Sequence, residues 1–318
     1  MRDNINISVV HDPVSERRHE AIRLIKNVRV YDDLELMLDG EAVDFVDIAS
    51  PPALHADSIR AALNAGAHVL VEKPLCLTLD DFHELVRLAA EKRRVLICVH
   101  NWKYAPPYAV ARIAIAAGRL GEIHFMSIDR LRTEAAGAGG AGGKWRASAQ
   151  SGGGILVDHG WHVFYLMHWL LGGVEPVSIS ARLGSPASRD ADDLADARVV
   201  FHGGTIGRSH LSWRAPVRRT SALIYGELGC IEIEGDRVTL TDRDGKSEDL
   251  SLPDVADDSY HPAWFGGVAE EFEQAVAEGP DSMVARLNLA EASSSLKLIV
   301  AARESSAQNG AAVPIPRD

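Results

Sequence analysis

The sequence contains little cysteine, with three in 318 residues, at positions 76, 98 and 230. Three widely separated thiols fit neither a disulfide framework nor the spacing of zinc ligands. Cys76 and Cys98 lie in apolar stretches, where a buried free thiol is the usual outcome. We therefore expect a protein without a disulfide framework and without a metal site.

Clustered positive charge and long apolar segments are also missing. The formal net charge is −12 at pH 7, which argues against a nucleic-acid partner, because phosphate binding needs a concentrated basic surface. No apolar run is long enough to span a bilayer, and residues 1–5 lack the basic and apolar regions of a signal peptide. These absences predict a cytoplasmic protein with no membrane partner.

The remaining composition is that of a folded protein with a large core. Hydrophobic residues make up 46% of the sequence and charged residues 25%, which is ordinary for a soluble globular protein. A chain of 318 residues usually divides into more than one domain. We predict two domains, at residues 1–101 and 102–318.

The first of these segments alternates short apolar strands with helices, a pattern typical of a doubly wound parallel α/β sheet. Gly66 follows one of the helices at a position where glycine commonly ends a helix. The expected strands are 5–10, 28–31, 43–48, 68–71 and 95–99, and the expected helices are 13–26, 34–38, 55–65 and 79–92.

The pattern changes after residue 101. A helix at 107–117 and a strand at 123–131 precede a run of small residues at 135–143, which is either a surface linker or a substrate lid. Several β-rich runs follow, separated by turns rich in glycine and aspartate, before two closing helices at 265–277 and 287–306. This order predicts an α+β domain with an open antiparallel sheet.

Two local features indicate chemistry. Lys73 follows a predicted parallel strand, and ligands of open α/β sheets bind at the carboxyl ends of such strands. After the glycines 152–154, Asp158 and His162 stand four residues apart, which on a helix puts them on one face with Cβ atoms about 5–6 Å apart. Each feature has a structural alternative, namely a solvated loop lysine and a histidine satisfied in the core.

The order of the motifs is more specific than any one of them. It runs Ser50-Pro51-Pro52-Ala53-Leu54-His55, Glu72-Lys73-Pro74, His100-Asn101-Trp102-Lys103-Tyr104-Ala105-Pro106, Gly118-Arg119-Leu120-Gly121-Glu122, and then GGGILVDHGWH from Gly152. Over nearly the whole chain this series resembles the glucose-fructose oxidoreductase / inositol dehydrogenase / MocA (Gfo/Idh/MocA) family of NAD(P)-dependent sugar and polyol oxidoreductases. The resemblance implies a Rossmann-like dinucleotide-binding domain, a substrate-binding domain, and a homodimer or homotetramer formed through the C-terminal sheet.

The resemblance also implies roles for single residues. Lys73 would contact the substrate hydroxyl and the nicotinamide region, His162 would take or give the hydroxyl proton, and Asp158 would orient substrate and histidine. These residue types suit the chemistry, because a histidine of pKa about 6.5 accepts a proton at neutral pH and a lysine stabilises a developing alkoxide. The implied cofactor-binding residues are Asp12, Ser50, Pro51, His55, Glu72, Lys73 and Asn101, and the implied substrate-binding residues are Lys73, Lys103, Trp145, Arg146, Asp158 and His162.

Some of these implied roles have alternatives. Asp12 favours NAD, whereas Arg17 or Arg18 nearby would admit the 2′-phosphate of NADP. Lys103 stands where many relatives have arginine, and the two residues are not interchangeable at a bidentate site. Trp145 is as well suited to packing as to lining a substrate pocket.

Three other polar side chains near His162 are interpreted as structural. His159 and His168 would lie away from the helix face that Asp158 and His162 share. Tyr165, about one turn beyond His162, is within possible reach of the site, but its place on an apolar helix favours the core.

The sequence has no glycine-rich phosphate turn. A dinucleotide fold normally begins with a strand, a Gly-x-Gly-x-x-Gly turn and a helix whose N-terminus binds the pyrophosphate. Residues 5–10, followed by Asp12, resemble the family's second strand, so the first βα unit is expected to be missing. A start codon placed too far downstream, a shortened chain, or a sheet re-formed with residues 5–10 in the central place would each explain this. If the chain is complete, nucleotide binding should be weak or lost.

The leading interpretation is an oxidoreductase that transfers a hydride between a sugar, inositol or related polyol and a nicotinamide cofactor. Lys73, Asp158 and His162 favour it. The alternative is a non-redox sugar-binding or regulatory homologue that has lost nucleotide binding, which the missing glycine turn favours. A third interpretation is epimerisation or glycoside cleavage through a transient ketone with retained NAD.

Overall fold

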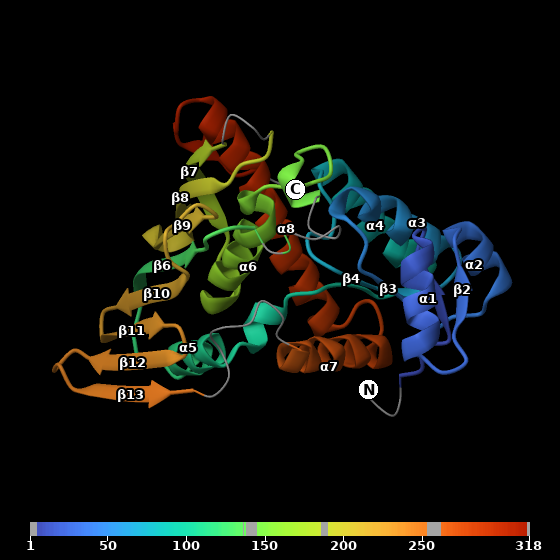
Figure 1. Cartoon of the computed structure of the whole chain (residues 1–318). Helices are drawn as coiled ribbons and strands as arrows, with labels where there is room; N and C mark the ends of the chain where they lie inside the picture. Colours follow the sequence, from blue (N-terminus) through green and yellow to red (C-terminus); the bar gives the residue numbers. More distant parts are fainter. Residues whose placement is uncertain (1–4, 136, 138–144, 186–189, 253–261, 317–318) are drawn as a thin grey trace.

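The structure is a computed structural model that describes residues 5–135, 137, 145–185, 190–252 and 262–316. It has two lobes, one built on short parallel strands and the other on one large sheet (Figure 1). The predicted linker or lid at 135–143 lies almost entirely outside the described residues.

The first lobe alternates strands and helices as predicted. Thr78 caps the helix that follows it by accepting a hydrogen bond from the backbone N–H of Asp81, and Gly66 takes the positive φ of +83° that ends the preceding helix. The elements are β1 (Val9–His11), α1 (Ser15–Leu24), β2 (Arg29–Tyr31), α2 (Leu34–Gly40), β3 (Phe45–Ile48), α3 (His55–Asn64), β4 (His68–Val71), α4 (Leu79–Lys92) and β5 (Leu96–Cys98).

The strands of this lobe form two separate parallel sheets. β1 pairs with β2, and β4 lies between β3 and β5 in the second sheet. Within the described residues no strand joins β1 to β3, so the segment 5–10 does not fill a central place between them. The prediction of a re-formed sheet is therefore wrong, while the parallel α/β class of this lobe is confirmed.

The second lobe is built on a nine-stranded sheet in the order β13-β12-β11-β10-β6-β9-β8-β7-β14. Its β6–β9 pair is parallel, so the sheet is mixed and not purely antiparallel as predicted. A long connection containing a helix and the β7–β8 hairpin separates these two strands, which allows the chain to return in the same direction. The strands are β6 (Ile123–Leu131), β7 (Pro176–Gly184), β8 (Leu194–Phe201), β9 (Ile206–Ser212), β10 (Arg219–Gly226), β11 (Gly229–Glu234), β12 (Arg237–Asp242), β13 (Ser247–Ser251) and β14 (Val313–Pro314).

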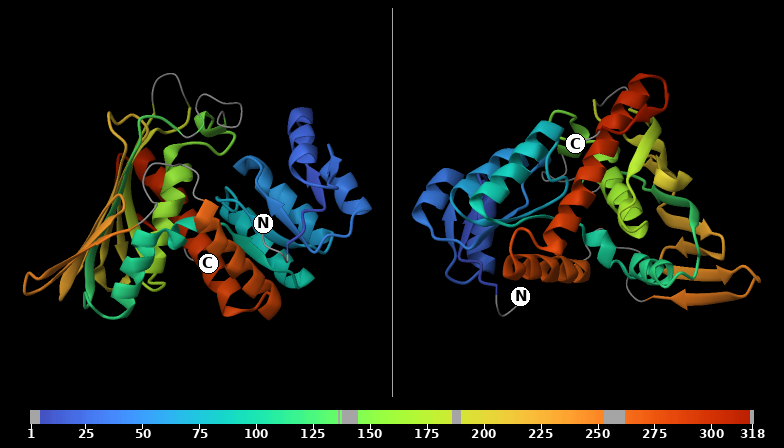
Figure 2. Two further views of the ribbon diagram at one scale, coloured as in Figure 1. Left: turned by 60° about the horizontal axis from the view of Figure 1, so that its bottom comes forward. Right: turned by 180° about the vertical axis from the view of Figure 1, so that it is seen from behind.

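The helices α5 (Pro106–Ala116), α6 (Trp161–Leu170) and α8 (Met283–Ala307) lie on one face of the large sheet, and no described helix covers the other face (Figure 2). Helix α7 (Pro262–Glu278) packs beside α8. The last two helices also reach the first lobe, where Val268 and Phe272 pack with Leu70 and Ile97 in one apolar cluster. In the described part of the chain, no helix has the length and apolar character needed to cross a membrane.

Candidate active site

Lys73, Arg146 and Asp158 form a group of ion pairs where the two lobes meet. Lys73 lies just beyond β4, and its Nζ donates to Oδ1 of Asp158 at 2.6 Å and to the backbone carbonyl of Asp158 at 2.9 Å. Nε of Arg146 donates to Oδ2 at 3.0 Å. Burial alone would raise the pKa of Asp158, but the cations of Lys73 and Arg146 hold it well below its usual value. The carboxylate is therefore ionised, and each of its oxygens has a cationic partner.

The three glycines allow this arrangement. A Cβ on Gly153 would lie 2.6 Å from the carbonyl oxygen of Arg146, and Gly154 has a φ of +104°. The N–H of Gly154 donates to the Arg146 carbonyl at 3.0 Å. Side chains at these positions would clash or be strained, so the glycines permit the close approach that sets Arg146 against Asp158.

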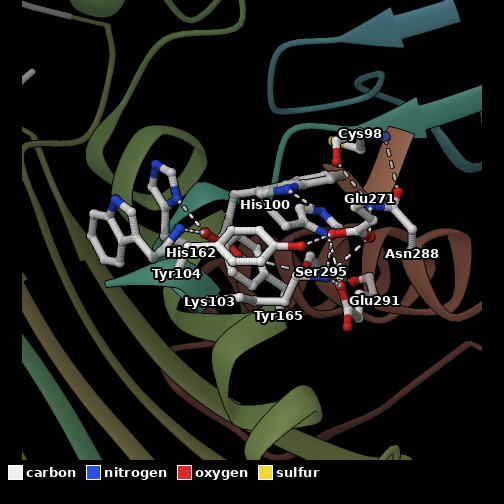
Figure 3. Close-up of polar contacts among 12 residues, drawn as sticks. Cys98, His100, Lys103, Tyr104, His162, Tyr165, Glu271, Asn288, Glu291 and Ser295 are labelled. Carbon is white, nitrogen blue, oxygen red and sulfur yellow. Dashed lines mark hydrogen bonds and ion pairs between the residues drawn. The ribbon is translucent and has the colours of Figure 1, made fainter. Parts of the chain in front are cut away.

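His162 is held by two aromatic residues. Trp102 stacks on the imidazole, with ring centroids 3.9 Å apart and planes at 4°. The Tyr165 hydroxyl lies 2.9 Å from Nδ1 of His162 and accepts the backbone N–H of Trp102 at 2.9 Å (Figure 3). Burial lowers the pKa of His162 well below its usual value, and Lys73 adds to the effect. The imidazole is neutral, and its Nε2 makes no hydrogen bond within the described residues.

Two expectations about this stretch need correction. Asp158 does not orient His162 in the described structure, because its oxygens are taken by Lys73 and Arg146 while Tyr165 holds the imidazole. Tyr165 is fully buried, as expected of a core residue, yet its hydroxyl is a polar contact of the site. The signal for it in the sequence is the spacing of three residues from His162, which places both on one side of α6.

His159 lies beside this group and does not point away from it. Residues 156–160 form a π-helical turn, so the positions of side chains differ from those of an α-helix. Nε1 of Trp213 donates to Nδ1 of His159 at 3.1 Å, which leaves the imidazole proton on Nε2. Burial lowers the pKa of His159 to about 3. A neutral, partly exposed imidazole therefore carries an N–H donor near Asp158.

Several predicted cofactor residues lie at the carboxyl ends of the parallel strands. Ser50, Glu72 and Asn101 follow β3, β4 and β5. Oγ of Ser50 and Oδ1 of Asn101 are buried without a partner among the described residues, and burial raises the pKa of Glu72. Unused buried polar atoms at this edge fit a ligand rich in hydroxyl and amide groups, such as the nicotinamide riboside end of a dinucleotide.

Two further predicted cofactor residues follow strands of the two separate parallel sheets. Pro51 follows Ser50 directly, and Asp12 follows β1. The Asp12 carboxylate accepts the N–H of Val14 at 2.8 Å and lies 3.5 Å from Nη1 of Arg17. Within the described residues no group of three or more His, Cys, Asp or Glu could hold a metal ion.

His55 does not face a ligand. Its side chain is fully buried, with Nδ1 at 2.6 Å from the Pro74 carbonyl and Nε2 at 2.8 Å from the Ser50 carbonyl. Both ring nitrogens are thus occupied by the backbone. The predicted cofactor contact of His55 is wrong, and the residue instead supports the turn that carries Lys73.

Lys103 also lies away from the predicted site. The short helix Asn101–Tyr104 turns its side chain inward between α7 and α8, where Nζ lies 2.9 Å from Glu291 and 3.1 Å from Glu271 (Figure 3). Burial alone would lower the pKa of Lys103, but the two carboxylates raise it. The prediction that Lys103 binds substrate is therefore wrong.

The other two predicted substrate residues lie together. Cζ of Arg146 is 4.3 Å from the ring centroid of Trp145, and both side chains are partly exposed. Trp145 therefore packs on the guanidinium that pairs with Asp158.

Residues 1–100 match the family model described as an oxidoreductase family with an NAD-binding Rossmann fold, and residues 108–232 match the model of the GFO/IDH/MocA C-terminal domain. The chain belongs to the Gfo/Idh/MocA oxidoreductase family. These matches confirm the predicted family and its Rossmann-like first lobe, and they agree with the predicted nicotinamide cofactor, because the family's fold is NAD-binding.

Similar proteins include both unassigned oxidoreductases and sugar dehydrogenases. An uncharacterized oxidoreductase of Synechocystis, sll0816, is 32% identical over 53% of this chain and 45% of its own length. D-glucoside 3-dehydrogenase of Escherichia coli is 27% identical over 82% of this chain and 78% of its own. The structure of a levoglucosan dehydrogenase with NADH and levoglucosan has the same fold, with a TM-score of 0.84 at 23% identity over 98% of this chain and 91% of that one. This chain matches about half (45%) of the length of the Synechocystis protein.

Proposed function

We propose that this protein is a dehydrogenase that oxidises a secondary hydroxyl of a sugar or polyol with NAD. The observation that carries the proposal is the neutral imidazole of His162, whose Nε2 is unused among the described residues, near the ammonium group of Lys73. The similarity to D-glucoside 3-dehydrogenase over most of the chain supports the substrate class. NAD, when bound, accepts the hydride.

The residues of the site stabilise the developing alkoxide and accept the hydroxyl proton. Lys73 has three N–H donors, of which Asp158 takes two, so the third is available to the substrate oxygen. A fixed positive charge there stabilises the alkoxide that develops as the proton leaves. Nε2 of His162 accepts that proton, while Nδ1–H donates to Tyr165. Asp158 and Arg146 set the direction of the lysine.

We further propose that the protein is cytoplasmic and that copies associate through the nine-stranded sheet into a homodimer or homotetramer. The face of that sheet that the helices leave uncovered supports this assembly (Figure 2). Analytical ultracentrifugation would detect it, and a monomer at micromolar concentration would contradict it.

A sugar-binding or regulatory role without nucleotide binding is the second candidate. One observation favours it: among the described residues the β1–β2 and β3–β4–β5 sheets are separate, and no Gly-x-Gly-x-x-Gly series links β1 to α1. Calorimetric titration with NAD+ and NADP+ distinguishes the two candidates. NAD+ binding supports the dehydrogenase, and sugar binding without nucleotide binding supports the second candidate.

Two substitutions test the assigned roles. Lys73→Met and His162→Gln should each abolish NADH formation while NAD+ binding persists, because they remove the alkoxide-stabilising charge and the base. Lys246→Met and His202→Gln, at exposed positions, are the matched controls and should retain turnover. Unchanged turnover in both site variants would refute the roles given to these residues.

A further inference from the structure

Two arginines extend the buried face of strand β6. Side chains alternate between the two faces of a strand, and here Met126, Ile128, Arg130 and Arg132 share the face that is buried. The side chain of Arg130 is 5% exposed and that of Arg132 is 9% exposed. Guanidinium groups are rarely buried unless they are paired.

No carboxylate neutralises these arginines within the described residues. Nη1 of Arg130 donates to Oγ1 of Thr220 at 2.8 Å, and Arg132 donates to the carbonyls of Leu131 and Arg219 and to the same Thr220 oxygen. Among the described residues, Nε of Arg130 is buried without a hydrogen-bond partner, as is the nearby Tyr108 hydroxyl. Burial lowers the pKa of Arg132 to about 9, and Arg130 contributes to that shift. A buried charge without a counterion lowers the stability of the folded protein, so a contribution to stability does not explain these two arginines.

The unpaired arginine lies next to the reacting centre. Cζ of Arg130 is 3.6 Å from the ring centroid of Trp102, and the imidazole of His162 stacks on the same indole at 3.9 Å. Two groups this close to one ring centroid must occupy opposite faces of the ring. Arg130, Trp102 and His162 therefore form one stack, with the indole between the guanidinium and the imidazole.

We propose that Arg130 and Arg132 bind a carboxylate of the substrate, so that this protein acts on sugar acids. Stacking on Trp102 uses the face of the Arg130 guanidinium. On its edge, the buried Nε has no hydrogen bond to a described residue, and the nearby Tyr108 hydroxyl is equally without one. That edge presents two parallel N–H donors, the geometry that a carboxylate accepts in a bidentate pair. Arg132 adds a second positive charge beside it. The inference rests on the proposed dehydrogenase function and specifies its substrate class.

The test compares sugars that differ only in the acid group. NADH formation is measured with glucose against glucuronate and with galactose against galacturonate. The wild-type protein is expected to show a kcat/KM at least tenfold higher for the acid of a pair. Arg130→Met should lower this acid-to-neutral ratio at least tenfold, mainly through KM for the acid. Arg119→Met, at an exposed position paired with Glu248, is the control and should keep the wild-type ratio.

Failure of the inference and failure of the proposed function give different results. Turnover of neutral sugars alone, or an unchanged ratio in Arg130→Met, overturns the carboxylate site and leaves the dehydrogenase intact. If no sugar is turned over, the dehydrogenase proposal fails. Calorimetry with glucuronate and glucose then decides the carboxylate site, since acid binding that Arg130→Met abolishes supports it and absent acid binding overturns it.

A stability measurement separates this role from a structural one. Arg130→Met removes a buried charge that has no counterion, so its melting temperature should equal or exceed that of the wild type. A lowered melting temperature with an unchanged acid-to-neutral ratio would instead make Arg130 a structural residue and overturn the proposal.

Discussion

The molecule contains two groups of buried charged side chains that differ in how completely their polar atoms are used. The closed cluster comprises Lys103, Glu271 and Glu291 together with His100, Tyr104 and Asn288. The open cluster comprises Lys73, Arg130, Arg132, Arg146 and Asp158.

In the closed cluster, each carboxylate meets several donors. Glu291 accepts from Lys103 and from Nδ1 of His100, both at 2.9 Å, while Nε1 of Trp161 donates to Nε2 of His100. Glu271 accepts from Lys103, from Nδ2 of Asn288 and from the Tyr104 hydroxyl. This cluster joins the segment after β5 to α7 and α8, and its function is structural.

In the open cluster, cations outnumber carboxylates and donors remain unused. Asp158 is the only carboxylate in this cluster as defined. The carboxyl group of Glu72 lies nearby and interacts electrostatically with Lys73, Asp158 and Arg146. Burial of charge alone therefore does not distinguish a functional site from a structural one. The distinction lies in buried hydrogen-bond donors and acceptors that have no protein partner, because a ligand can bind only to groups that the protein itself does not use.

The largest expected effect comes from breaking the closed cluster. Lys103→Met leaves two buried carboxylates without their cation and should destabilise the protein by about 3–5 kcal/mol. Urea denaturation measures the loss. Arg87→Met is the control, because its pair with Glu91 is 68% and 62% exposed, and it should cost about 0.5 kcal/mol or less. Similar small losses in both variants would mean that the closed cluster is not structural.

A smaller effect on the reaction is expected from the hydroxyl that holds His162. Tyr165→Phe keeps the ring and removes the hydrogen bond to Nδ1, so kcat should fall about 10–100-fold, or about 1.4–2.7 kcal/mol, with little change in KM. The pH profile of kcat should shift as well, because the imidazole loses its fixed tautomer. Tyr225→Phe, on a ring that is 41% exposed, is the control. An unchanged kcat and pH profile would show that Tyr165 only packs.

Stability is also expected to fall in mild acid. Burial lowers the pKa values of His100, His159 and His162 from 6.5. The unfolded chain therefore binds protons near pH 6.5 that the folded chain does not, and stability is lost as the pH falls from there toward the folded pKa values. The melting temperature should be constant between about pH 7 and 8 and several degrees lower by about pH 5. His162→Gln should flatten this slope, whereas His202→Gln, at an exposed position, should not. A melting temperature that is constant down to pH 5 would contradict the pKa shifts.

The sequence predicts most of the fold because its elements have clear periodicity and end signals. The strand at 123–131 and the helix at 79–92 are bounded as expected. The parallel β6–β9 pair was not predictable, since strand direction depends on how a long connection returns to the sheet. The family resemblance, by contrast, placed Lys73 and Asp158 in one site, and the structure brings the two side chains together.

Side-chain direction accounts for the errors at the site. Lys103 and His55 stand in the expected motifs, but a motif does not specify which way a side chain turns, and burial among carboxylates or carbonyls decides it. Arg130 and Arg132 were missed, although a signal was present. In a strand, alternate residues share one face, and Met126 and Ile128 are on the buried face. Charged residues that continue this alternation are therefore predicted to be buried and to need a counterion.

Helix α8 makes buried polar bonds to both lobes. Asn288 exchanges two hydrogen bonds with the backbone of Cys98 beside β5, at 2.9 and 3.0 Å, and Ser305 accepts the N–H of Ala181 on β7 at 2.8 Å. A rigid-body swing of one lobe against the other would break such bonds at about 1 kcal/mol or more each. The helix therefore acts as a brace that holds the β3–β4–β5 sheet and the nine-stranded sheet in a fixed relative position.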